Sequence, residues 1–138
     1  MSSNDENAKK PASFEEFWPY YVRAHSNKTN RRLHFVGTTL AMACVGGAAV
    51  LRRPALLIAA PIVGYGFAWV GHFVFEKNIP ATFGNPVWSL RADFKMWTKI
   101  ANGTMDGEVE RVMSGTGDEE AVNASDVANG GRVEATAN

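Results

Sequence analysis

The chain has 138 residues, of which 46% are hydrophobic and 20% charged, and its formal net charge is zero. This length allows a single domain, and the lone cysteine, Cys44, excludes an intrachain disulfide. Residues 1–102 carry 12 Lys and Arg against 6 Asp and Glu, whereas residues 103–138 carry 2 against 8. A basic body beside an apolar core favours an anionic membrane surface, and no nucleic-acid partner is expected.

Residues 1–12 are polar, which predicts a disordered N-terminus and no signal peptide. The segment that follows, SFEEFWPYYVRAH, predicts a short amphipathic helix. Ser13 and Glu16 have the spacing of a capping box, and Pro19 is expected to kink the helix or keep it short. Its five aromatic side chains are of the types that settle at a membrane interface, so an interfacial helix is predicted.

Two long apolar runs come next. Residues 33–51 carry no fixed charge over 19 residues, and residues 55–75 carry none over 21. Because a helix needs about 20 residues to cross a hydrocarbon core of about 30 Å, an integral membrane protein is predicted, with two antiparallel spans near 33–51 and 55–77. Arg52, Arg53 and Pro54 mark the turn. More basic residues lie on the side of the termini than at the turn, so both termini are expected in the cytoplasm.

Residues 85–103 predict a second amphipathic interfacial helix. Asn85 is the expected N-cap, Pro86 the first helical residue and Gly103 the end. Residues 103–138 are acidic and poor in large apolar side chains, which predicts a disordered tail. The predicted fold class is therefore all-α: a transmembrane helical hairpin flanked by two interfacial helices, forming a membrane domain over residues 13–102.

The three histidines of the chain are predicted to meet at one membrane surface. His34 and His72 each lie 19 residues from Arg53 at the turn, about 28 Å along a helix. His25 precedes His34 by nine residues, at the junction between the interfacial helix and the first span. Ionisable residues at such depths usually mark a functional site. Three imidazoles predict a metal or proton site, and iron, zinc and copper are all compatible with the spacing.

Small residues and two polar groups accompany these histidines. Stripes of small residues face each other along the two spans (Gly37, Ala41, Cys44 and Ala48; Ala60, Gly64 and Ala68), which favours close helix packing. Asn30 shares the face of His34 and is a candidate hydrogen-bonding group behind the ligands. Glu76 lies one turn after His72, and it is either a further ligand or an ion-pair partner of basic residues such as Lys77.

Two blocks of the sequence, HSNKTNRRLHFVG and GHFVFEKNIPA, placed around a predicted hairpin, resemble the Mpo-type family of fungal 2-hydroxy fatty acid dioxygenases and their short bacterial and plant relatives. The resemblance covers about residues 13–100. It implies an Fe(II)-dependent membrane enzyme that uses O2 to shorten a 2-hydroxy fatty acid by one carbon in alpha-oxidation. The positions matching the family's iron ligands are His25, His34 and His72.

Two other functions remain open from the sequence. His34 and His72 on adjacent spans are also compatible with a bis-histidine haem in an electron carrier. The chain is equally compatible with a non-catalytic, structural or lipid-organising membrane protein. A homo-oligomer is a further expectation.

Overall fold

The computed structural model describes residues 10–116, 119 and 123, and over residues 10–116 it contains helices and no strand. The chain order is α1 (Phe14–Arg23), α2 (Lys28–Val50), α3 (Ala55–Val70), η1 (Gly71–Glu76), η2 (Ala81–Phe83), α4 (Pro86–Ala101) and α5 (Met105–Met113). The first of the two short elements, η1, is a π-helix that continues α3, and η2 is a single 3₁₀ turn. The predicted all-α class is confirmed.

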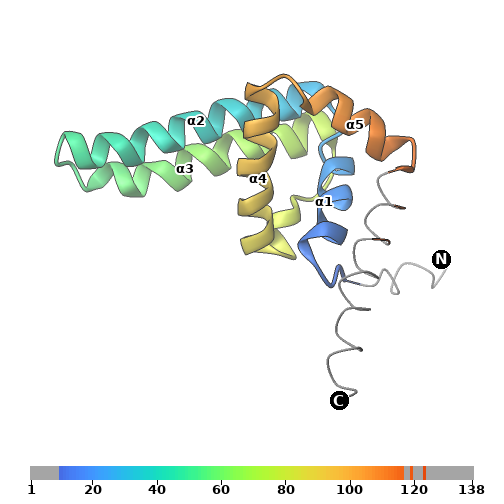
Figure 1. The fold of residues 1–138 in the computed structure, drawn as a ribbon. Helices are drawn as coiled ribbons and strands as arrows, with labels where there is room; N and C mark the ends of the chain where they lie inside the picture. The colour runs from blue at the N-terminus through green and yellow to red at the C-terminus, as the bar shows by residue number, and fades with distance from the viewer. Residues whose placement is uncertain (1–9, 117–118, 120–122, 124–138) are drawn as a thin grey trace, which may run out of the picture.

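Helices α2 and α3 form an antiparallel hairpin that extends well beyond the other helices (Figure 1). The first span begins five residues earlier than predicted, because the Asn27 side chain caps α2 by accepting from the backbone N–H groups of Thr29 (2.8 Å) and Asn30 (3.3 Å). The second span runs from Ala55 to Glu76 when α3 and η1 are taken together.

The hairpin helices are long and apolar enough to cross a membrane. In each, only 17% of the most apolar 18-residue window is buried, whereas the core helix of a soluble protein is mostly buried. Apolar side chains such as Val50, Ile58 and Ile62 are instead exposed, by 66–82% of their surface. Exposed apolar surface along two helices of this length is compatible with a pair of membrane spans.

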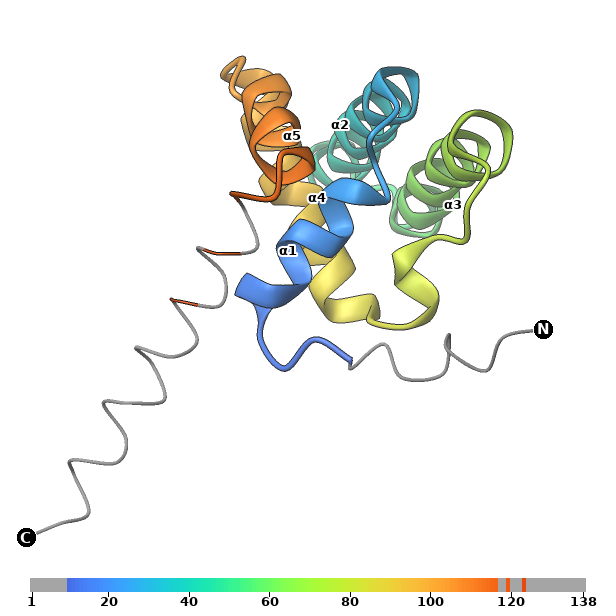
Figure 2. The same ribbon diagram turned by 90° about the vertical axis from the view of Figure 1, so that its right-hand side faces the viewer.

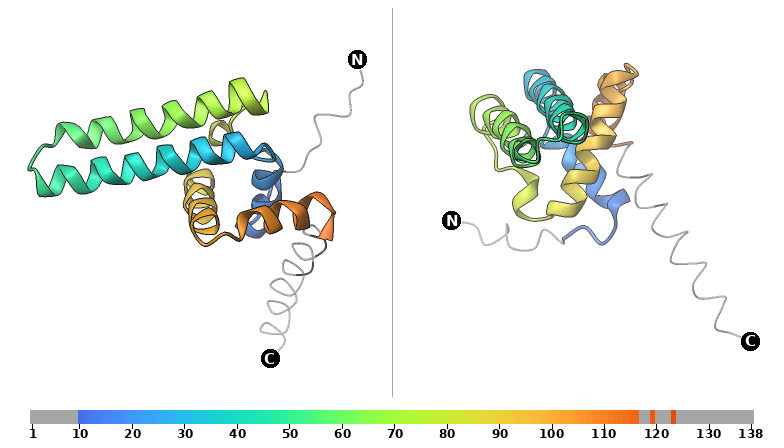
Figure 3. Two further views of the ribbon diagram at one scale, coloured as in Figure 1. Left: turned by 90° about the horizontal axis from the view of Figure 1, so that it is seen from above. Right: turned by 90° about the vertical axis from the view of Figure 1, so that its left-hand side faces the viewer.

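Helices α1, α4 and α5 pack together at the open end of the hairpin (Figure 2). Their core contains the buried side chains of Phe17, Trp18, Tyr21, Val22, Ala92, Met96, Met105 and Val112. Helix α1 begins at the predicted cap, where Ser13 Oγ accepts from the Glu16 N–H at 3.2 Å, and with Pro19 inside it is 10 residues long. Helices α1 and α4 both run across the hairpin axis (Figure 3).

Helix α4 begins at Pro86 as predicted, but the Asn85 side chain makes no capping hydrogen bond. The helix ends just before Gly103, whose φ of 77° is the left-handed conformation that favours glycine. Val87 and Leu90 on α4 are more than half exposed. The placement of α1 and α4 at a membrane interface remains a prediction.

The predicted start of the disordered tail at residue 103 is wrong, because residues Met105–Met113 form α5. Met105 and Val112 are buried against the other helices, so two apolar residues at helical spacing outweigh the acidic composition.

Glu108 accepts from Trp18 Nε1 at 2.6 Å and from Arg111 Nη2 at 2.7 Å. Burial alone would raise the pKa of Glu108, but these hydrogen bonds hold it at about 2. Of the segments predicted to be disordered, 1–12 and 103–138, residues 1–9, 117–118, 120–122 and 124–138 lie outside the described residues.

Candidate metal centre

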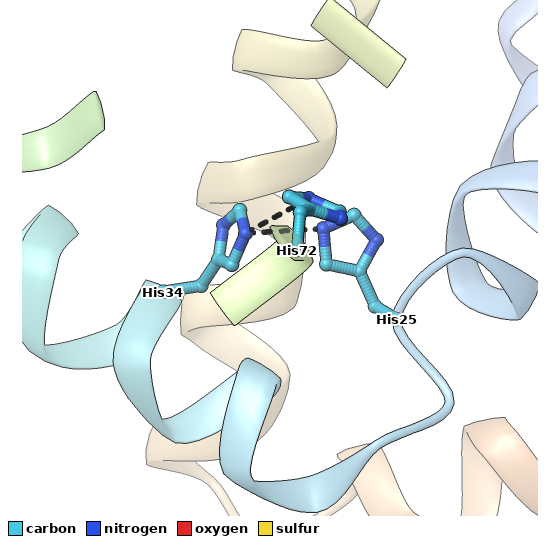
Figure 4. A group of neighbouring side chains, drawn as sticks. All are labelled: His25, His34 and His72. Atoms are coloured by element: carbon cyan, nitrogen blue, oxygen red, sulfur yellow. Dashed lines mark hydrogen bonds between the residues drawn. The ribbon is translucent and has the colours of Figure 1, made fainter. Parts of the chain in front are cut away.

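Three imidazoles from three separate segments converge at the open end of the hairpin (Figure 4). His25 lies in the loop after α1, His34 in the second turn of α2, and His72 in η1. The Nε2 atoms of His25 and His34 are 3.3 Å apart, and those of His34 and His72 are 3.2 Å apart. All three side chains are buried, and their ligand atoms lie within 4.8 Å of one another. The sequence-based prediction that the three histidines meet therefore agrees with the geometry.

Each imidazole has its other nitrogen, Nδ1, against an oxygen acceptor: Tyr21 O at 2.7 Å for His25, Asp93 Oδ1 at 3.2 Å for His34, and Asn78 Oδ1 at 2.7 Å for His72. The Asn78 amide is oriented by its own Nδ2, which donates to Ala24 O at 2.9 Å. Since all three partners accept, the Nδ1 nitrogens carry the protons. The three Nε2 lone pairs are therefore left pointing toward one another.

This arrangement fits a bound cation. The unprotonated Nε2 atom of His34 lies 3.3 Å from that of His25 and 3.2 Å from that of His72, and lone pairs at these distances repel in the absence of a shared proton or ion. Two imidazole nitrogens bonded to one metal at about 2.1 Å lie roughly 3.0–3.4 Å apart for octahedral to tetrahedral angles. Fixing each ligand through an Nδ1–H bond to an oxygen is also the usual arrangement behind metal-binding histidines. The donor set and its support thus suit a first-row transition metal.

The surroundings keep His25 in the neutral form that a metal requires. Burial lowers the pKa of His25 well below its ordinary value, and the adjacent His34 and His72 lower it further. Tyr21 stacks on His25, with ring centroids 4.0 Å apart, and its hydroxyl donates to Asp93. Burial, followed by the charge of Asp93, raises the pKa of Tyr21 well above its ordinary value, so Tyr21 remains a donor.

A close backbone approach positions His72. A Cβ added to Gly71 would lie 2.0 Å from Asn30 Oδ1, so only glycine fits where η1 crosses α2. Asn30 Nδ2 donates to Glu76 Oε2 at 3.2 Å, which orients the amide and leaves Oδ1 facing Gly71 without a hydrogen-bond partner among the described residues. Asn30 thus contacts η1 at Gly71, next to His72. The prediction that it hydrogen-bonds a ligand histidine is not supported, because its Nδ2 donates to Glu76.

Glu76 is not part of the histidine cluster. Its carboxylate accepts from Ser26 Oγ at 2.6 Å, from the Asn27 N–H at 2.9 Å and from Asn30 Nδ2. These contacts tie the end of η1 to the loop between α1 and α2, which carries His25. The structure therefore gives Glu76 a positioning role, and the expectation that it supplies a further ligand is not supported.

Arg31 connects the same loop to α5. Its guanidinium donates to the carbonyls of His25 (3.0 Å) and Ser26 (2.6 Å), and it pairs with Asp106 Oδ1 at 2.9 Å. Arg31 is almost fully buried, so breaking these contacts would leave a buried charge without partners. Helix α5 thereby helps to fix the backbone at His25.

Asp93, Asn78 and Tyr21 were not singled out from the sequence. Asp93 had a signal that could have been used: it is the single acidic residue of α4, a helix that otherwise carries three basic residues. Asn78 follows a left-handed residue, Lys77 (φ 58°), at the end of η1, and this turn could not be predicted from the sequence. Tyr21 was assigned to the interfacial aromatics, but it is 1% exposed.

The geometry does not suit a bis-histidine haem. Axial ligands on opposite faces of a haem have nitrogens roughly 4 Å apart, twice a metal–imidazole bond, with the macrocycle between them. The Nε2 atoms of His34 and His72 are closer than this, at 3.2 Å, and the centroid of the His25 ring lies 4.5 Å from the centroid of each of their rings.

The fold and the site together define an all-helical protein with an apolar hairpin and a buried three-histidine cluster that could hold a metal. The family model described as 2-hydroxy-palmitic acid dioxygenase Mpo1-like matches residues 11–105, which is most of the chain, and the protein belongs to that family. No curated protein and no solved structure matches it. The matched residues contain all three histidines and end at the first residue of α5.

Proposed function

We propose that the protein is an Fe(II)-dependent dioxygenase that uses O2 to shorten 2-hydroxy fatty acids by one carbon within a membrane. The observation that carries the proposal is the convergence of three Nε2 atoms, each held by an Nδ1–H bond, next to an apolar cavity. The family's dioxygenase description supports the reaction type. Three neutral imidazoles leave coordination positions open, as oxygen-activating iron sites require.

The chain's own residues supply the support for this chemistry. Bound iron would provide the redox steps through which O2 reacts with an organic substrate. His25, His34 and His72 would hold the ion, and Asp93 keeps the proton of His34 on Nδ1. Asp93 also lines the cavity with His34 and His72, so its carboxylate can accept a proton from a hydroxyl that reaches the cluster.

A membrane location supports an amphiphilic substrate. With the turn at Arg52 and Arg53 at one membrane surface, the histidines lie about 28 Å away, at the depth of the opposite headgroups. The basic residues outside the hairpin favour termini on the cytoplasmic side. A carboxylate and a 2-hydroxyl at headgroup depth therefore meet the site while their acyl chain stays in the bilayer.

An iron-dependent assay tests the proposal. Detergent-purified protein, loaded anaerobically with Fe(II), is given 2-hydroxypalmitate or palmitate in air, and the products are measured by mass spectrometry. We expect an acid one carbon shorter from the 2-hydroxy substrate alone, with O2 consumption. The variants His25→Ala, His34→Ala and His72→Ala should each abolish activity and bound iron. Product formation by all three histidine variants at the parent rate would refute the proposal.

Glu76→Gln serves as the matched control for these variants. Because Glu76 contacts the loop and not the cluster, this variant should keep far more iron than any of the histidine variants while unfolding more easily. Loss of iron equal to that of a histidine variant, with stability unchanged, would instead make Glu76 a ligand.

A further inference from the structure

A cavity of about 490 Å³ begins at the histidine cluster and continues between α2 and α3. The predicted stripes of small residues supply part of its wall, through Ala41 on α2 and Ala60, Gly64 and Ala68 on α3. Gly37 on α2 does not line the cavity but packs directly against α3, since a Cβ at this position would lie 2.8 Å from Phe67 Cβ. The two helices thus touch along one side and leave a groove along the other.

The groove is polar at one end and apolar along the rest of its length. The end at the histidine cluster, near the open end of the hairpin, is lined by His34, His72, Asp93, Thr38 and Thr82. Further toward the α2–α3 turn, the lining changes to apolar side chains such as Met42, Val45, Ala60 and Pro61. A ligand matching this groove has a compact polar end and one long apolar chain.

The length of the groove corresponds to one membrane leaflet. Val45 lies 11 residues after His34, and Ala60 lies 12 residues before His72. At 1.5 Å per residue these separations are about 16–18 Å. One leaflet of a hydrocarbon core about 30 Å thick is about 15 Å deep. Beyond this point the helices close together, because a Cβ at Gly47 would lie 3.3 Å from Leu56 Cδ1.

The groove is open along one side. Tyr65, Trp69, Leu90 and Phe94 line it, yet each keeps 40–55% of its surface exposed. These exposed apolar side chains continue the lipid-facing surface of the hairpin. A chain can therefore move sideways from the bilayer into the groove without crossing water.

We propose that this groove holds a single acyl chain of an amphiphilic carboxylic acid taken laterally from the adjacent leaflet. The carboxyl end lies at the histidines and the methyl end at Val45 and Ala60, which set the longest chain that fits. The chemistry at the polar end rests on the function proposed above, whereas chain binding itself needs no metal.

Photo-crosslinking of the metal-free protein in phosphatidylcholine vesicles tests this placement. A palmitoyl-length 2-hydroxy acid carrying a diazirine at its methyl end is irradiated, and the labelled peptides are identified by mass spectrometry. We expect saturable labelling at Met42, Val45 and Pro61, reduced by unlabelled 2-hydroxypalmitate. Labelling that does not saturate and falls on outward residues such as Ile58 and Ile62 would show lipid contact only and would overturn the proposal.

A pair of valine variants tests the chain-length limit. Val45 and Val36 are both on α2 and are similarly exposed (51% and 42%), but only Val45 lines the groove. Val45→Trp should reduce saturable labelling by the palmitoyl-length probe roughly fivefold or more, the factor expected from overpacking. It should leave a medium-chain probe unaffected, and Val36→Trp should leave both unaffected. An equal response of the two variants would contradict the proposal.

A pair of glycine variants covers the case in which Val45→Trp does not fold. A Cβ at Gly64 would make an ordinary contact with Ala41 Cβ at 3.5 Å, whereas a Cβ at Gly66 would meet open space. Gly64→Ala narrows the groove part-way along its length and should weaken labelling by the long probe, while Gly66→Ala should not. Labelling that is unchanged by Gly64→Ala would count against the groove.

The results separate this proposal from the function on which it rests. Saturable labelling in the groove, without iron-dependent shortening of any 2-hydroxy acid, would keep the acyl-chain site and refute the dioxygenase. Iron-dependent shortening, with labelling outside the groove and no chain-length change in Val45→Trp, would keep the dioxygenase and refute the groove.

Discussion

Replacing Gly71 with alanine tests whether the crossing of η1 over α2 positions the metal site. The new Cβ would lie 2.0 Å from Asn30 Oδ1 and 3.0 Å from Asn30 Cγ, distances at which atoms overlap. Asn30 is fully buried, and its Nδ2 is held by Glu76, so the amide has no free direction in which to move. Either Asn30 breaks this hydrogen bond or η1 shifts, and His72 is the next residue along η1.

The expected cost follows from these two contacts. Overpacking a buried site typically costs about 1–3 kcal/mol, and losing a hydrogen bond to a charged group costs about 1.5–3 kcal/mol. Gly71→Ala should therefore destabilise the fold by roughly 2.5–6 kcal/mol if both costs are incurred. A displacement of His72 should also weaken metal binding, because the Nε2 atoms of His34 and His72 would no longer lie at 3.2 Å.

Gly66→Ala is the matched control, five residues earlier in the same helical segment. A Cβ at Gly66 has no heavy atom within 4 Å, so alanine should stabilise by up to about 1 kcal/mol through its higher helix propensity. The assay is denaturant unfolding in detergent with and without Zn²⁺, together with Zn²⁺ affinity by calorimetry. Equal stability and equal affinity of the two variants would refute the role given to Gly71.

Three further results are expected. Asp93→Ala should weaken metal binding about 10- to 100-fold, as measured by calorimetry. Tyr21→Phe should weaken it less, because the Asp93 carboxylate still accepts from His34. Equal losses of affinity would contradict these different roles of Asp93 and Tyr21. Deleting residues 105–138 should reduce both stability and metal affinity, and deleting residues 117–138 should change neither; a harmless longer deletion would show that α5 is dispensable. Burial lowers the pKa of His25 in the folded state. Metal-free protein should therefore lose stability as the pH falls below about 6.5, the pKa of a histidine in the unfolded chain. Unfolding curves that do not change with pH in this range would show that the pKa of His25 is not lowered by folding.

The hairpin and the meeting of the histidines could be predicted because both follow from counting along the chain. Two charge-free runs of membrane length on either side of Arg52, Arg53 and Pro54 place equidistant positions side by side, so His34 and His72 face each other by symmetry. The all-α class follows from the same runs, from the cap at Ser13 and from Pro86 at the first position of α4.

The contacts that hold the site could not be predicted in this way. Asp93 reaches His34 only because α4 crosses the hairpin, and the crossing depends on tertiary packing that no local pattern encodes. Glu76 is spaced as a ligand on a regular α-helix, but η1 is a π-helix, which changes the direction in which each side chain points. The acidic composition of residues 105–113 suggested disorder. Helix α5 was missed because the hydrogen bonds of Glu108 with Trp18 and Arg111 cannot be seen in the sequence.

X-ray absorption of the anaerobically Fe(II)-loaded protein, with iron counted per chain, tests the metal centre most directly. The account predicts one iron per chain, with scattering from three imidazole rings at about 2.0–2.2 Å. His72→Ala should reduce the bound iron to a small fraction of this. Iron bound by fewer than three imidazoles, or one iron per chain retained in His72→Ala, would contradict the assignment of His25, His34 and His72 as the ligands.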